Sequence, residues 1–272
     1  MDKLDRLGWA DGIAISSYGV RVGIRANDPA ALEKVKHLLP PGSKLAESPV
    51  VEKIYSLIIG GPSASPNIRR FNLLYGNHIR LARERDEELV YDALETELQL
   101  YVAEMARRRV FVHAGVVGWH GKAIVIPGKT FAGKSTLVAE FVRAGATYYS
   151  DEYAVFDARG RVHPYARALA IREKPFDKPK KLALESLGAS IGTKPLDVGM
   201  ILVSEYKAGA RWRPATRKIS AGQGALALLA NAVAARREPK KMLATLQQVV
   251  AHATILKSSR GEAKEVVQAI LK

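Results

Sequence analysis

The feature that most constrains this chain is a glycine-rich loop between a short apolar segment and an amphipathic one. It reads Gly128-Lys129-Thr130-Phe131-Ala132-Gly133-Lys134-Ser135 and matches the pattern G-x-x-x-x-G-K-[ST] in full. Glycine permits the backbone angles that bring the N–H groups of such a loop close to phosphate oxygens. We therefore expect a strand over residues 123–127, then a helix whose positive N-terminal end faces a bound polyphosphate.

The residue types in this loop predict a bound nucleoside triphosphate with Mg²⁺. Lys134 is expected between the β- and γ-phosphates, and the Ser135 hydroxyl is expected to bind Mg²⁺. Such loops serve hydrolases, switches, motors and kinases, so the reaction must be inferred from other residues. The predicted nucleotide-binding residues are Gly128, Lys129, Thr130, Phe131, Ala132, Gly133, Lys134, Ser135 and Thr136.

Two acidic residues follow the loop at a spacing that should return them to it. Asp151 and Glu152 come after an expected helix, which Gly145 is placed to end, and an expected strand over residues 146–149. In an open α/β sheet, a strand-helix-strand unit brings the end of its second strand next to the loop. One carboxylate can then hold Mg²⁺, and the other can accept the proton of an attacking hydroxyl.

Hydrophobic periodicity predicts two α/β domains, with a boundary between residues 108 and 109. The N-terminal domain, residues 1–108, should contain several strands, a helix over residues 29–39 and a longer helix with apolar positions from Val90 to Met105 that ends at Arg107-Arg108-Arg109. The C-terminal domain, residues 109–272, should begin with a hairpin that turns at His120-Gly121-Lys122. It should end with three helical stretches after Gly222.

Composition excludes several classes of function. The chain has no cysteine, so disulfides, thiolate metal sites and a cysteine nucleophile are excluded. It has no run of about 18 apolar residues, so we expect no membrane span and a cytoplasmic protein. The formal charge of +15 favours anionic ligands without choosing among them, and the short basic clusters are interpreted as solvated faces.

Three segments together resemble a known family. In order and spacing, Val112-His113-Ala114-Gly115-Val116-Val117, the loop and Tyr149-Ser150-Asp151-Glu152 resemble the catalytic domain of the bacterial HPr kinase/phosphorylase family, over about residues 110–205. That fold is similar to that of ATP-dependent phosphoenolpyruvate carboxykinase, so the resemblance implies a mixed sheet around the loop. It also implies that Asp151 is the base that activates a serine hydroxyl and that His113 lies beside Asp151 and tunes it.

The chain departs from the family at a later signature. The family's Glu-Ile-Arg-Gly run corresponds here to Ala170-Ile171-Arg172-Glu173, so Glu152 or Glu173 would replace the metal-binding glutamate. Arg172 is expected to steady the transferred group. Because that signature also bears on the reverse reaction, we expect a kinase rather than a phosphorylase. The resemblance further suggests a homo-oligomer.

The sequence therefore predicts an ATP- and Mg²⁺-dependent phosphotransferase that moves the γ-phosphoryl group to a hydroxyl, most plausibly a serine of a protein or peptide. A small-molecule kinase acting on an amino acid or sugar is an alternative. A nucleotide-dependent nucleic-acid-binding protein is less favoured and rests on the net charge and on Trp212 between Arg211 and Arg213. A regulatory protein that holds ATP without turning it over remains a further alternative.

Overall fold

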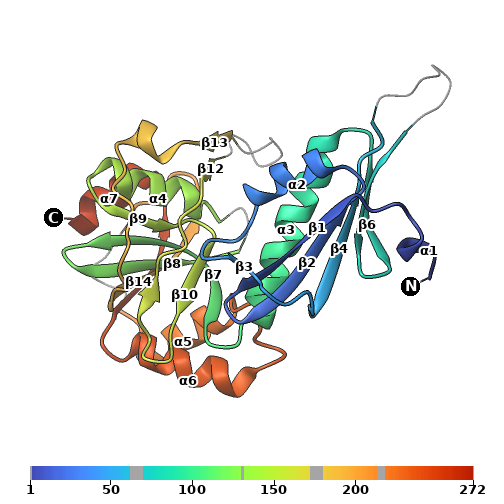
Figure 1. Ribbon diagram of the computed structural model, residues 1–272. Helices are drawn as coiled ribbons and strands as arrows, with labels where there is room; N and C mark the ends of the chain where they lie inside the picture. The colour runs from blue at the N-terminus through green and yellow to red at the C-terminus, as the bar shows by residue number, and fades with distance from the viewer. Residues whose placement is uncertain (1, 62–69, 130–131, 172–179, 213–217, 272) are drawn as a thin grey trace. The chain divides into compact units, whose positions relative to one another are not determined.

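The computed structural model describes residues 2–61, 70–129, 132–171, 180–212 and 218–271 (Figure 1). The chain divides into two compact units, Met1–Arg107 and Arg108–Lys272, and each unit is described by itself. Both units are α/β, and each is built on a mixed sheet. Within the described ranges, no helix is long and apolar enough to cross a membrane.

The first unit contains a six-stranded sheet in the order β3-β1-β2-β4-β5-β6, in which only β2 and β4 are parallel. Helices α2 and α3 pack on one face of it, where Leu32, Leu94 and Leu98 join the core (Figure 1). The elements are α1 (Asp2–Asp5), β1 (Asp11–Ser17), β2 (Val20–Ala26), α2 (Pro29–Lys36), β3 (Lys44–Leu45), β4 (Lys53–Ile58), β5 (Asn72–Gly76), β6 (Ile79–Glu84) and α3 (Glu87–Met105).

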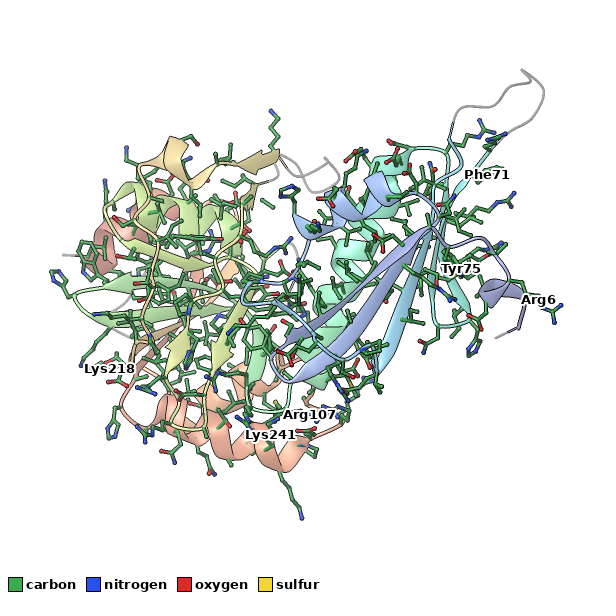
Figure 2. The ribbon with its side chains drawn as sticks, viewed as in Figure 1. Arg6, Phe71, Tyr75, Arg107, Lys218 and Lys241 are labelled. Carbon is green, nitrogen blue, oxygen red and sulfur yellow. The ribbon has the colours of Figure 1, made fainter. Side chains whose placement is uncertain are left out.

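Local sequence explains where the two main helices of this unit begin. Asp28 and Asp86 are their N-caps, and each side chain accepts a hydrogen bond from the backbone N–H two residues later. Both predicted helices are present, but each ends earlier than predicted: the first ends at Lys36 instead of residue 39, and the second ends at Met105 instead of at Arg107-Arg108-Arg109. Phe71, labelled in Figure 2, directly precedes β5. Its ring centroid lies 4.0 Å from the guanidinium carbon of Arg83.

The second unit contains a seven-stranded mixed sheet in the order β11-β10-β7-β8-β14-β15, with β9 also paired to β7. β7 is antiparallel to β8, β9 and β10, whereas β8, β14 and β15 are parallel. Its elements are β7 (Val110–Trp119), β8 (Lys122–Pro127), α4 (Lys134–Arg143), β9 (Thr147–Ser150), β10 (Tyr153–Phe156), β11 (Val162–His163), β12 (Leu169–Ile171), β13 (Lys180–Leu182), the 3-10 helix η1 (Leu184–Leu187), β14 (Val198–Tyr206), α5 (Ala221–Leu229), α6 (Pro239–Val250), β15 (Thr254–Arg260) and α7 (Ala263–Leu271).

Helices cover both faces of this sheet. α4 and α7 pack on one face, and α5 and α6 pack on the other (Figure 1). Successive residues of β7 alternate between the two cores: Val112 and Ala114 lie on the α5–α6 side, and Val117 lies on the α4–α7 side. Burial on both faces explains why β7 reads as an almost continuous apolar run.

Two predicted turns deliver the chain to and from the loop. His120 and Gly121 have φ values of 46° and 73°, which form the tight turn of the β7–β8 hairpin. Gly145, with φ of 96°, follows the end of α4 and allows the chain to leave that helix. Both turns agree with the prediction from the sequence.

The C-terminal region differs from the prediction. Three helices lie between Ala221 and Leu271, in agreement with the three helical stretches predicted from Gly222 onward, but strand β15 lies between the last two and pairs in parallel with β14. The segment Thr254–Arg260 is mostly polar and alternates weakly, so it has little strand signal of its own. Its conformation depends on pairing with β14, which lies about fifty residues earlier in the chain.

Candidate active site

The predicted phosphate loop joins β8 to α4, with Thr130 and Phe131 outside the described residues. The Gly128 N–H donates to the carbonyl oxygen of His113 at 3.2 Å and holds the start of the loop against β7. Gly133 has φ of 72° and gives α4 no side-chain cap. A helix N-terminus without a cap keeps N–H groups available for an anion.

Lys134 is the first residue of α4 and is only 8% exposed. Its Nζ donates to the carbonyl oxygen of Lys129 at 3.0 Å, so the side chain folds back across its own loop. Burial lowers the pKa of Lys134, and the negative charges of Glu152 and Asp151 oppose that shift. A buried ammonium held mainly by one carbonyl is well suited to gain a phosphate oxygen as a partner.

Asp151 directly follows β9 and is 6% exposed. Its Oδ2 accepts hydrogen bonds from the Ser135 hydroxyl at 3.0 Å and the Ala170 N–H at 3.3 Å, and its Oδ1 accepts one from Tyr148 at 2.9 Å. Burial raises the pKa of Asp151 even though these hydrogen bonds act to lower it. The structure thus places this carboxylate against the serine of the loop.

His113 lies beside Glu152, where the family resemblance had implied Asp151. Its Nδ1 is 3.5 Å from Oε1 of Glu152, while its ring lies 4.8 Å from that of Tyr153. Burial acts to raise the pKa of Glu152, but the hydrogen bond and charge of His113, together with Lys134, outweigh it, so this pKa is lowered. The hydrogen bonds of Asp151 go to other residues, which leaves Glu152 as the acid that pairs with the histidine.

A break between β9 and β10 explains how two consecutive acids reach the same site. In a regular strand, neighbouring side chains point to opposite faces. Here residues 151 and 152 form a bend in which the Ser150 hydroxyl accepts the N–H groups of Glu152 and Tyr153 at 3.2 and 3.0 Å. The bend lies opposite the part of β7 next to His113, because the Ala114 N–H donates to the backbone carbonyl oxygen of Glu152 at 3.1 Å.

The oxygen atoms at this site fit Mg²⁺ bound together with a polyphosphate. Ser135 and Asp151 offer a hydroxyl and a carboxylate within 3.0 Å of each other, and Mg²⁺ prefers one or two such protein ligands, with phosphate and water completing its shell. In the part of the chain that the structure describes, no three His, Asp or Glu side chains form a metal-binding group. Arg172 and Glu173 lie outside the described residues.

Three residues at the site were not predicted from the sequence. Tyr148 hydrogen-bonds Asp151, Arg167 acts electrostatically on Glu152, and Arg260 donates to the carbonyl groups of the loop. Tyr148 belongs to the run that ends in Asp151, so its proximity offered a weak signal. Arg167 lies two residues before β12 and Arg260 is the last residue of β15, and neither residue is part of a motif that the sequence analysis used.

No protein-family model matches the sequence, and no curated protein matches it significantly. The chemistry of the site therefore carries the functional argument.

Proposed function

We propose that this protein is an ATP- and Mg²⁺-dependent phosphotransferase that moves a γ-phosphoryl group to a hydroxyl. The observation that carries the proposal is the 3.0 Å hydrogen bond between Ser135 of the loop and the buried carboxylate of Asp151. A serine from a phosphate loop paired with a strand-end aspartate is the oxygen set that holds Mg²⁺ in many nucleotide-binding enzymes.

The remaining residues of the loop fit the phosphates. Backbone N–H groups at the start of α4 would bind their oxygens, and Lys134 would exchange its bond to Lys129 for one to the β- and γ-phosphates. When bound, Mg²⁺ would neutralise charge on the same phosphates. Arg172 is proposed to steady the transferred group, as the sequence suggested.

Two assignments of the acids are open, and the contacts favour one of them. The family resemblance makes Asp151 the base and gives the metal to Glu152. The hydrogen bond to Ser135 instead favours Asp151 as the partner of the metal, and it leaves Glu152, which is half-exposed beside His113, to accept the hydroxyl proton. A base must lie within hydrogen-bond reach of the acceptor, which a more exposed carboxylate satisfies more easily.

The proposed acceptor is a serine of a protein or peptide, on the family resemblance. A small-molecule hydroxyl on an amino acid or sugar is the alternative within the same reaction. The two differ in the product, because label transferred from ATP is precipitated with protein in the first case and stays soluble in the second.

The experiment is incubation of the protein with γ-labelled ATP, Mg²⁺ and a cell extract of the organism that makes it, together with direct measurement of ATP binding. If Asp151 partners the metal, Asp151→Asn should reduce the Mg²⁺-dependent gain in ATP affinity, whereas Glu152→Gln should keep that gain and lose transfer by about 100-fold or more. If Asp151 is the base, the two variants should exchange these results.

Asp157→Asn is the matched control, since Asp157 is also a buried aspartate of this unit but bonds Arg161 and His163 in the turn after β10. It should retain binding and transfer whenever it folds. Wild-type protein that binds no ATP with Mg²⁺, or that binds it but transfers label to nothing, would contradict the proposed reaction.

A further inference from the structure

Arg260, the last residue of β15, is the most deeply buried charged residue near the loop, with 2% of its surface exposed. Its Nη2 donates to the carbonyl oxygens of Ala132 and Gly133 at 3.1 and 2.9 Å, and its Nη1 donates to that of Gly261 at 3.2 Å. Two of these acceptors belong to the residues that directly precede Lys134. Arg260 therefore holds the loop directly before the first residue of α4.

Hydrogen bonds to backbone carbonyl oxygens stabilise the buried positive charge of the Arg260 guanidinium. Burial lowers the pKa of Arg260, and Tyr206 and Glu262 act in the opposite direction without a described ion pair to it. Burying a cation is costly unless it is well hydrogen-bonded, so the three carbonyl contacts offset a large desolvation cost. Placement of an arginine here is thus tied to the geometry of the loop.

Peptide geometry links these carbonyl contacts to phosphate binding. In a trans peptide, the C=O and the following N–H point in opposite directions. When Arg260 draws the carbonyls of Ala132 and Gly133 to one side, the N–H groups of Gly133 and Lys134 face the other. Those N–H groups lie at the uncapped N-terminus of α4, where an anion would bind.

Contact between Arg260 and the loop also accounts for the glycine at position 133. A Cβ added to Gly133 would collide with Nη2 of Arg260, and the φ of 72° at this position disfavours any side chain. A planar guanidinium can bridge two neighbouring carbonyls, whereas a lysine ammonium on a flexible stem cannot reproduce this fork.

We propose that Arg260 is a positioning residue that fixes the loop in its anion-binding conformation by holding the carbonyls of Ala132 and Gly133. It acts on the phosphates through the loop amides and does not contact the nucleotide itself. The identity of the ligand in this inference rests on the proposed function, whereas the contacts between Arg260 and the loop do not depend on that function. It explains why a strand so far along the chain ends at the phosphate loop.

The test compares Arg260→Met and Arg260→Lys with Lys257→Met, which removes a positive charge from an exposed position of the same strand. Affinities for ATP and for inorganic triphosphate are measured by calorimetry. Arg260→Met should weaken the binding of both ligands by a similar factor of about 10 or more, since the loop amides are no longer held in position to donate hydrogen bonds to the charged phosphates. Arg260→Lys should lose most of this affinity, and Lys257→Met should change it by less than about 2-fold.

Hydrogen exchange of the loop peptide without nucleotide supplies the second readout. The amides of residues 132–135 should exchange faster in both Arg260 variants than in wild type and Lys257→Met. If Arg260→Met does not fold, as judged by circular dichroism, Arg260→Lys carries the test. Unchanged affinity together with unchanged exchange in a folded Arg260 variant would overturn the proposal. Wild type that binds no nucleotide would refute the proposed function, while loop exchange would still decide the role of Arg260.

Discussion

Asp151 is a residue whose position opposes stability. Its carboxylate is buried, and burial raises its pKa above the ordinary aspartate value of about 3.9. Ionising it therefore costs more in the folded protein than in the unfolded chain, so the free energy of unfolding falls as pH rises through the raised pKa. Such a cost is expected at a site where the charge is needed for a ligand.

Replacement of Asp151 by asparagine is expected to stabilise the protein without nucleotide at neutral pH. The amide cannot ionise, and its oxygen can still accept from Ser135 and Ala170. We expect the melting temperature to rise by a few degrees at pH 7, and the difference to disappear below about pH 4, where the aspartate is protonated in both states. Thermal melts of both proteins across this range provide the measurement.

Asp157 offers a contrast of opposite sign. Burial acts to raise its pKa, but hydrogen bonds from His163 and Arg161 lower it to about 2. The stabilisation that the ionised Asp157 carboxylate gives the folded protein is present above the ordinary aspartate pKa and is lost as pH falls through about 2, so Asp157→Asn should destabilise the protein at pH 7.

For Asp151→Asn, a melting temperature lower than that of wild type at pH 7 would contradict the assignment of a costly buried charge.

The packing of α4 on β7 is the element-scale contact that sets the position of the loop. Gly115 lies on the α4 side of β7, and a Cβ there would lie 2.5 Å from Cγ2 of Val138. Glycine therefore lets the helix approach the strand closely. Because α4 begins at Lys134, a shift of the helix would also move the lysine and serine of the loop.

Gly115→Ala is expected to lower stability by about 1–3 kcal/mol, the usual cost of forcing an extra group into a packed core. It should also weaken ATP binding, since displacement of α4 changes the N-terminus that faces the phosphates. Gly8→Ala is a suitable control because a Cβ at that glycine would meet no atom within 4 Å. Denaturant unfolding and calorimetry measure the two effects, and equal stability of the two alanine variants would disprove the packing argument.

At the scale of the whole molecule, charge is distributed unequally between the two units. Met1–Arg107 has 14 basic and 15 acidic residues, whereas Arg108–Lys272, the unit with the loop, has 28 basic and 12 acidic residues, so the net positive charge of the chain belongs to the second unit. Lys218 and Lys241 are two of its basic residues (Figure 2). An excess of positive charge on the unit that carries the loop raises the local concentration of a polyanionic ligand.

The two units also have separate hydrophobic cores, so we expect nucleotide to stabilise only one of them. ATP with Mg²⁺ at about 100 times its dissociation constant should stabilise the second unit by about 2.7 kcal/mol. Hydrogen exchange should then slow in β7, β9 and α4 and remain unchanged in the strands β1, β2 and β4. Equal protection of both units would show that the nucleotide acts on more than the loop-bearing unit.

The sequence by itself determined the features that depend on local chemistry. The strand and helix that flank the loop, the hairpin turn at His120-Gly121 and the amphipathic helix that contains Val90 and Met105 follow from glycine positions and apolar periodicity, which act over a few residues. The spacing to Asp151 also sufficed to place this acid beside Ser135, because a strand-helix-strand unit has few geometries.

Only the tertiary structure decided which acid meets which partner. The bend after β9 turns Asp151 toward Ser135 and leaves Glu152 beside His113, and no local pattern distinguishes two consecutive carboxylates. Arg260 reaches the loop because β15 pairs with β14, and that pairing joins residues about fifty positions apart. Long-range pairing and burial fix these contacts, since their free energy comes from neighbours that are distant in the chain.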